Sequence, residues 1–143
     1  DLTVQAEMAT QRFTFAGEEI YDLKASLLLK NKIFSIPNLE FKKGRGSVQL
    51  GMSVDLDEDT FKLAFKSRNL VASDLFLYKQ VNPSFSSAVQ FEGAYKKIKN
   101  SSDGVFNFLL SDSRLNGEPI SDSYLAVQWK DGVAKIQGKY ANN

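Results

Sequence analysis

Residues 48–65 read VQLGMSVDLDEDTFKLAF, and apolar and polar residues alternate along most of this stretch. The apolar positions are Val48, Leu50, Met52, Val54 and Leu56 in the first half, and Phe61, Leu63 and Phe65 in the second half. A period of two is typical of a β-strand with one apolar face. The acidic segment 57–59 between the halves is typical of a turn. The stretch is therefore predicted to form a β-hairpin with one apolar and one polar face.

The same alternation recurs along the rest of the chain, from residue 4 to residue 139. We expect roughly ten strands of four to nine residues, joined by turns such as 116–117 and 131–132. Pro37 lies inside one of these runs and indicates a bulge or a sheet edge. Residues 96–104 are expected to form a long hairpin loop. The predicted fold class is all-β, an antiparallel meander that forms a curved, groove-like half-barrel sheet or a sandwich.

One segment, 69–82, departs from this pattern. Ser73 and Asp74 are good helix N-cap residues, and Leu75, Tyr78 and Val81 follow at near-helical spacing before Pro83. We therefore expect one short helix over 73–82, lying over the open end of the sheet.

The length suits a single β-domain over residues 1–143, and both ends suggest a fragment of a longer, repetitive envelope protein. Residues 15–36 also resemble residues 115–136. In both segments a glycine turn, a strand and a second turn fall in step at an offset of 100 positions, as at Gly17 and Gly117. A weak internal repeat is predicted.

Composition excludes several classes of function. The 18 basic and 17 acidic residues leave a net charge of +1, which provides no long-range attraction for nucleic acid. The chain has neither cysteine nor histidine, so it lacks thiol nucleophiles, cysteine zinc ligands and the commonest general base. We predict that the chain is not an enzyme and carries no metal or cofactor.

Two local motifs resemble ligand loops only superficially. The acidic segment 55–59 begins like an EF-hand, but Thr60 and Lys66 occupy the positions of the required glycine and glutamate. The segment 44–47 has two glycines but not the spacing of a phosphate loop. Both are predicted to be turns. The basic clusters 42–45 and 96–99 are interpreted as solvated strand ends, with contact to lipid phosphate as the alternative.

The apolar face of the predicted sheet has two interpretations, because a filled core and an open groove for acyl chains have the same alternation. On the groove hypothesis, the lining residues are Leu27, Leu29, Val48, Leu50, Met52, Val54, Phe61, Leu63, Phe65, Val89, Phe91, Phe106, Phe108, Leu125, Val127 and Trp129.

Three stretches of the sequence resemble the AsmA-like family, which includes the TamB (translocation and assembly module) proteins. Residues 17–33 (GEEIYDLKASLLLKNKI) resemble a "G-x-x-I-x-D-L" turn followed by a strand, a polar turn and a return strand. Residues 39–56 are similar to the glycine-flanked strand that comes next, and residues 61–75 to a strand that leads into a short amphipathic helix. Pro37 and the segment 96–104 depart from the family pattern.

The resemblance implies a segment of a periplasm-spanning protein that is tethered to the inner membrane through regions outside this chain. It implies lipid transport and outer-membrane biogenesis in the cell envelope, with phospholipid held on an apolar inner sheet face. Neighbouring β-units of the same chain and outer-membrane assembly proteins are the implied partners. The alternative is a protein-interaction or scaffold module with a closed core, such as an adhesin or secretion-system domain.

Overall fold

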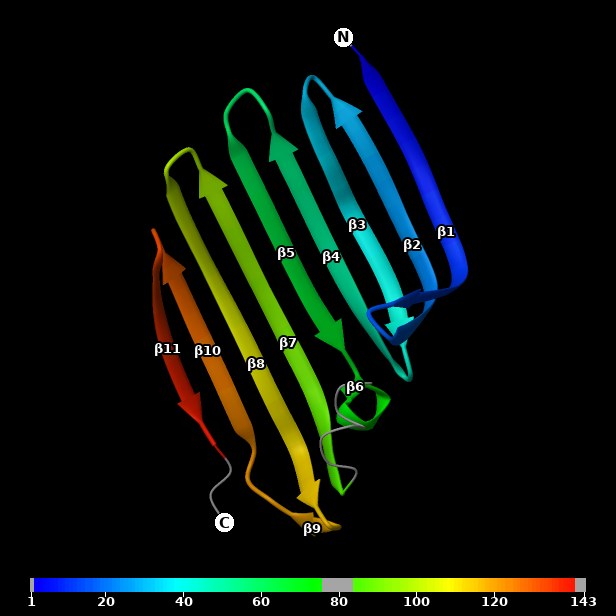
Figure 1. Cartoon of the computed structure of the whole chain (residues 1–143), viewed down its shortest axis with the longest axis vertical. Helices are drawn as coiled ribbons and strands as arrows, with labels where there is room; N and C mark the ends of the chain where they lie inside the picture. The colour runs from blue at the N-terminus through cyan, green and yellow to red at the C-terminus, as the bar shows by residue number, and fades with distance from the viewer. Residues whose placement is uncertain (1, 76–83, 141–143) are drawn as a thin grey trace.

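The computed structural model describes residues 2–75 and 84–140. They form one antiparallel sheet in which the long strands follow each other in chain order (Figure 1). The strands are β1 (Thr3–Phe15), β2 (Glu18–Lys30), β3 (Ile33–Lys43), β4 (Gly46–Asp55), β5 (Thr60–Arg68), β6 (Leu70–Val71), β7 (Phe85–Ile98), β8 (Ser101–Leu115), β9 (Glu118–Pro119), β10 (Ser123–Lys130) and β11 (Val133–Lys139). The predicted all-β meander is confirmed. Most strands are longer than the predicted four to nine residues.

Tight turns connect the long strands, and several of them require the left-handed backbone region. Asp131 and Gly132 have φ angles of 45° and 87°, as a type I′ hairpin turn demands. Asn116 and Gly117, with φ of 53° and 86°, form a second turn of this kind. The turns at 16–17 and 31–32 also have two residues with positive φ, so the corresponding turns of the predicted repeat share a conformation.

The predicted long loop over 96–104 is wrong. β7 continues to Ile98 and β8 begins at Ser101, so only Lys99 and Asn100 connect them. Lys96 pairs with Asp103 and Lys97 with Ser102 in the antiparallel register. The polar composition that suggested a loop belongs to strand ends at the margin of the sheet.

A β-bulge at Pro37 keeps the apolar side chains of β3 on one face, as the proline indicated. Ile36 lies opposite Met52, and Leu39 lies opposite Leu50. Between these two pairs, β3 therefore contains one more residue than β4. The extra residue reverses the alternation. As a result, the residues on both sides of the bulge share a face with the apolar side chains of β4.

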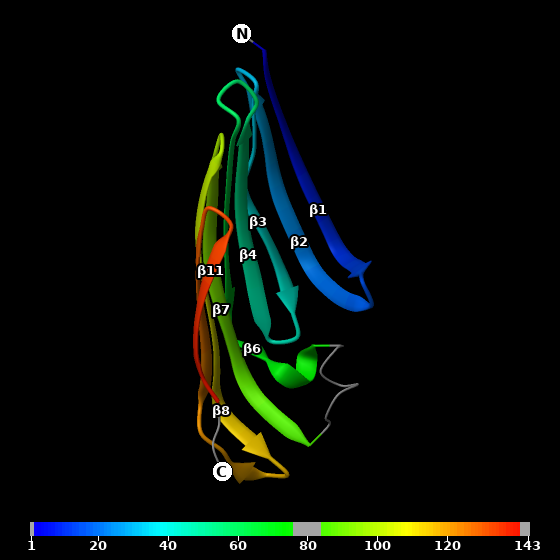
Figure 2. The ribbon, with the colours of Figure 1, turned by 60° about the vertical axis from the view of Figure 1, so that its left-hand side comes forward.

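The sheet is curved, and this gives it a concave and a convex side. In Figure 2, β1, β2 and the lower ends of β7 and β8 bend toward the same side. β6 and the 3-10 turn η1 (Ala72–Asp74) lie on that side as well. β6 belongs to the sheet through its pairing with β7, and η1, which follows it, turns out of the sheet over the concave side.

The short helix predicted over 73–82 is described only in part. A single 3-10 turn ends at Asp74, and Leu75 already has extended dihedral angles (φ −91°, ψ 128°). A helix therefore does not begin at Ser73. Residues 76–83 lie outside the described part of the chain.

Candidate functional site: the concave apolar face

The candidate site is the concave face of the sheet, where strand pairing aligns apolar side chains in rows that cross the strands. One row runs through the side chains of Leu39, Leu50, Phe65, Gly93, Phe106, Val127 and Ile136, each directly opposite the next. A second row runs parallel to it through Ile36, Met52, Leu63, Tyr95, Gly104, Trp129 and Ala134. All the residues predicted to line a groove fall on this one face.

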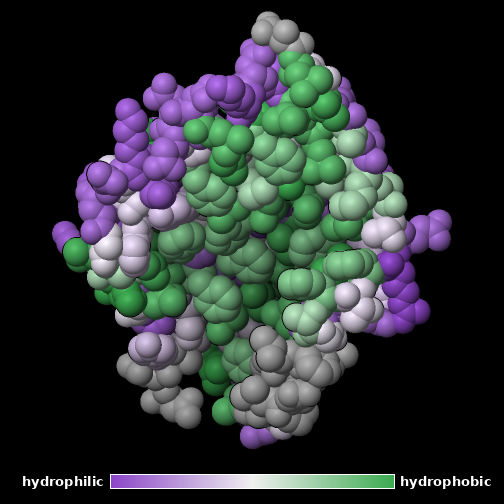
Figure 3. All heavy atoms as spheres, turned by 45° about the horizontal axis from the view of Figure 1, so that its top comes forward, coloured by the Kyte–Doolittle hydropathy of each residue, from purple (hydrophilic) through white to green (hydrophobic). Residues whose placement is uncertain are grey.

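This face is only partly buried by the described residues. The side chains of Leu50, Leu63 and Phe65 are half-buried, although they lie in the middle of the sheet. Phe108 and Leu125 are 39% and 38% exposed. Figure 3 shows a continuous hydrophobic surface over the centre of this face, with hydrophilic residues along its margins. An exposed apolar surface of this continuity is typical of an interaction or ligand-binding face.

One end of the concave face is closed. Leu70 on β6, 1% exposed, forms a buried cluster with Ala72 and Val89. Partly buried apolar residues that pack against this cluster are Val48, Leu75, Phe85, Phe91 and Leu110. A Cβ atom at Gly46 would lie 2.7 Å from Leu70 Cδ2, so the glycine permits this close approach. The β6–η1 segment thus acts as a wall across the lower end of the face.

The buried polar groups near this wall are satisfied. The hydroxyl groups of Ser87 and Ser113 lie 2.9 Å apart, and the backbone N–H of Phe91 donates to Ser67 Oγ at 2.8 Å. Glu18 and Lys43 form an ion pair at 2.6 Å, with side chains 24% and 13% exposed. This ion pair joins the first residue of β2 to the last residue of β3.

Aromatic rings dominate the middle of the face. The ring of Phe65 packs against Phe91 at 5.9 Å and against Phe106 at 5.8 Å, and Phe61 packs against Tyr95 at 6.0 Å. These rings form a broad apolar floor across β5, β7 and β8.

The margin of the face farthest from β6, called the upper margin below, has a polar corner where β7 ends, β8 begins and β10 ends. Trp129 donates its indole N–H to Ser102 Oγ at 3.0 Å, and Ser102 lies directly opposite Lys97. Asp131 accepts hydrogen bonds from the backbone N–H of Ser102 at 2.7 Å and from Ser101 Oγ at 2.9 Å. These hydrogen bonds lower the pKa of Asp131 below its usual value. The bond from the Ser102 N–H has the larger effect, and the bond from Ser101 has the smaller one.

The two basic clusters are divided between the faces. Lys96 points to the convex side and Lys97 to the concave side, because neighbouring residues of a strand alternate. In the cluster 42–45, Lys42 forms an ion pair with Asp22 at 2.7 Å, and this pairing lowers the pKa of the Asp22 carboxyl group. The next residue, Lys43, pairs with Glu18 instead. This division was not predicted from the sequence, because Lys96 and Lys97 were expected in a loop, where residues do not alternate between two faces.

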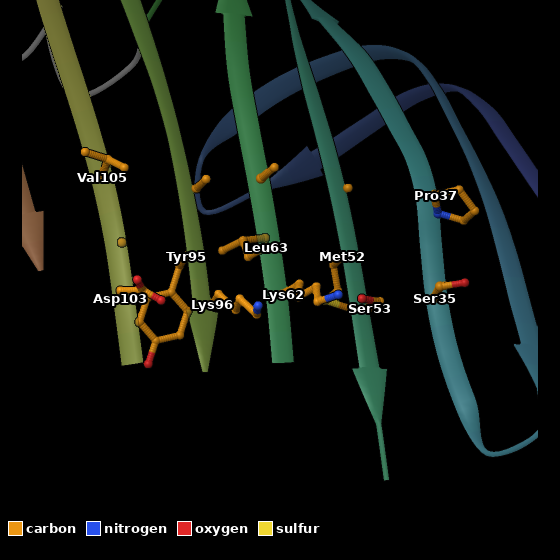
Figure 4. Close-up of a pocket in the computed structure, with 14 residues that line it drawn as sticks. Ser35, Pro37, Met52, Ser53, Lys62, Leu63, Tyr95, Lys96, Asp103 and Val105 are labelled. Atoms are coloured by element: carbon orange, nitrogen blue, oxygen red, sulfur yellow. The ribbon is translucent and has the colours of Figure 1, made fainter. Parts of the chain in front are cut away.

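The convex face carries a shallow hollow of about 630 Å³ (Figure 4). Small residues form its floor, namely Gly51, Ala64 and Ala94, which lie opposite one another on β4, β5 and β7. Lys62 and Lys96, also directly opposite each other, flank it. The hollow was not anticipated from the sequence. It arises where short side chains meet between rows of long polar ones.

The two loop-like motifs are turns, as predicted. Asp55 Oδ1 accepts the backbone N–H groups of Asp57 and Glu58 at 3.0 and 3.1 Å, so this carboxylate is used within the hairpin turn. Gly44, with a φ of 56°, lies in the turn between β3 and β4. Within residues 2–75 and 84–140, no group of three or more acidic side chains is placed to bind a metal ion.

No known protein family, curated protein or solved structure matches this chain. The likeness to the AsmA-like family therefore stays a prediction from the sequence patterns. In the described part of the chain, no helix has the length and hydrophobicity to cross a membrane.

Proposed function

We propose that this chain binds the acyl chains of lipids on its concave face, as one segment of a longer lipid-conduit protein of the cell envelope. The observation that carries the proposal is the set of aligned apolar rows on an open, curved sheet, half-exposed from β2 to β10. The expected setting is the periplasm, with the membrane tether outside this chain. Neighbouring β-units and outer-membrane assembly proteins are the expected protein partners.

The dimensions of the face suit an acyl chain. Phe91 and Lys97 mark the lower and upper limits of the open face on β7, and six residues of strand span about 20 Å. The hydrocarbon core of a bilayer is about 30 Å thick, so one acyl chain spans about 15 Å of it. Each methylene moved from water to such a surface contributes about 0.8 kcal/mol.

The test is native mass spectrometry of the chain after expression in bacteria, with extraction of any lipid that copurifies. Leu50→Arg places a charge in the middle of the concave face and is expected to abolish lipid retention. Gln49→Arg introduces the same side chain one residue away, on the convex face, and is expected to retain lipid. Circular dichroism must show that both variants fold.

A second outcome of the same experiment would contradict the proposal. A lipid-free wild-type chain that light scattering identifies as a dimer, and that Leu50→Arg converts to a monomer, would mean that a second copy covers the apolar face.

The alternative function, a protein-interaction or scaffold module, has one specific observation in its favour. β1 and β11 form the two edges of the sheet, and every residue of β11 is exposed. An edge strand of this kind can pair with a strand of a partner protein. The N–H group of Ala134 points away from β10, because Ala134 is in a non-hydrogen-bonded pair with Trp129, so Ala134→Pro would hinder pairing with a partner strand at this edge.

A further inference from the structure

We infer that the concave face binds its lipid in one orientation, with an anionic headgroup at the corner formed by Lys97, Ser102 and Trp129 and the acyl chain directed toward β6. This inference rests on the proposed function, because it concerns the same face. It names the chemistry of the ligand: a single-chain or double-chain amphiphile whose headgroup carries a negative charge, such as a phosphodiester.

The distribution of charge on the concave face supports this orientation. The upper rows of the face, which contain the aligned residues of β2 to β10, carry one charged side chain among the described residues, Lys97. Its position in β7 is opposite Phe61 on one side and Ser102 on the other. A cation at the margin of an apolar surface is placed where an anionic headgroup would leave that surface.

Lys97 is available for such a contact. Its Nζ lies 4.0 Å from Asp59 Oδ2, and the two side chains are 46% and 72% exposed. An ion pair with this separation and exposure contributes little and is screened by solvent. A phosphate that approaches along the face can replace it. The other lysine of this face, Lys43, is paired closely with Glu18 at the opposite end.

The neighbours of Lys97 provide amphipathic contacts. Tyr95 and Trp129 lie on either side of Gly104 in the same row, next to the apolar floor. The indole N–H of Trp129 already donates to Ser102 Oγ at 3.0 Å. Aromatic side chains with one apolar and one polar end are typical of the level where acyl chains meet headgroups.

The closed lower end supplies an independent argument. The β6–η1 segment covers the concave face around Val89 with buried apolar residues. A charged headgroup placed there would have to lose its hydration against Leu70 and Ala72, at a high free-energy cost. The tail therefore fits this end, and the headgroup fits the open upper corner.

The first test compares two probes that share a palmitoyl chain: anionic lysophosphatidylglycerol and uncharged monopalmitoylglycerol. Binding below the micellar concentration is measured for the wild type, Lys97→Met and Lys96→Met. In Lys97→Met, the preference for the anionic probe is expected to fall about three- to fivefold, the effect of one partly exposed ion pair. Lys96→Met removes the same charge from the convex face and is expected to keep the preference.

The outcomes separate the two proposals. If both probes bind and Lys97→Met keeps the preference, or Lys96→Met loses it equally, the orientation is wrong and the lipid-binding face stands. If neither probe binds to the folded wild type, the proposed function fails, and the orientation fails with it.

The second test uses Trp129, which is the only tryptophan of the chain. Bromine atoms quench indole fluorescence at contact distance, so the position of bromine on the acyl chain reports the direction of the chain. A chain brominated near its ester end is expected to quench Trp129 more strongly than one brominated near its methyl end. Equal quenching, or the reverse order, would overturn the inferred orientation.

Discussion

Phe65 and Phe106 stack directly over Gly93, although their strands are separated by β7. Their ring centroids lie 5.8 Å apart, with the ring planes inclined by 20°. A Cβ atom at Gly93 would lie 2.5 Å from Phe106 Cδ1 and 2.7 Å from Phe65 Cζ. The floor of the concave face is therefore continuous across three strands because the central residue has no side chain.

Gly93→Ala is expected to destabilise the fold by about 1 to 3 kcal/mol, because the added methyl group forces the two rings apart. Urea denaturation followed by circular dichroism measures this change. Gly51→Ala is the control, since a Cβ atom there meets its nearest neighbour, the carbonyl oxygen of Pro37, at 3.2 Å. Equal losses in the two variants would contradict the stacking argument.

Leu70→Ala is expected to cost about 2 to 5 kcal/mol, the usual range when a fully buried leucine is truncated. Leu70 is 1% exposed and is the centre of the cluster that closes the lower end of the face. The same substitution at Leu56, which is 68% exposed, is expected to change the free energy of unfolding by less than about 0.5 kcal/mol. If Leu70→Ala were as mild as Leu56→Ala in urea denaturation, β6 would not be held against the sheet.

Acidification is expected to loosen the corner at Trp129. Hydrogen bonds from Ser102 and Ser101 lower the pKa of Asp131 in the folded state, so on acidification the unfolded chain binds this proton first. The contribution of Asp131 to stability is complete at neutral pH. It is lost as the pH falls from the usual carboxyl pKa through the lowered pKa of the folded state.

Trp129 fluorescence measures this transition, because its indole N–H is bonded to Ser102. Asp131→Asn keeps a residue that tolerates the positive φ of the turn but removes the titrating group. The variant is expected to lose the acid transition of the fluorescence. A transition of unchanged midpoint and amplitude in Asp131→Asn would assign it to another carboxyl group.

Deletion of Asn38 tests the bulge in β3. Without the extra residue, Leu39 and Phe41 would turn to the convex face or β3 would lose its pairing with β4. Because each large apolar side chain contributes about 1.5 to 3 kcal/mol when buried, a loss of about 3 kcal/mol or more is expected. Asn38→Ala keeps the chain length and is expected to remain close to the wild type in thermal denaturation.

The sequence predicts the strand-and-turn pattern well where the side chains alternate strictly. The β4–β5 hairpin and the glycine turns at 116–117 and 131–132 follow from period and turn chemistry alone. The position of the β3 bulge also follows, because proline cannot donate a hydrogen bond within the sheet.

The sequence misleads where polar residues occupy regular strands or where contacts are distant. Lys96 and Lys97 suggested a loop, yet they pair with Asp103 and Ser102 in the register. The wall formed by Leu70 depends on its packing against side chains of β4, β7 and β8, which local periodicity does not encode. The corner at Lys97 likewise depends on the strand pairing that brings Ser102 of β8 and Trp129 of β10 next to it.

The chain order of the strands has a consequence for how this protein is made and how it varies. Each long strand pairs only with strands close to it in the sequence. The pairing of one strand therefore does not require a strand from a distant part of the chain. The sheet can therefore form hairpin by hairpin, in the order in which the chain emerges. A hairpin can also be inserted or deleted without changing how the other strands pair. The width of the apolar face can therefore change by one hairpin at a time during evolution.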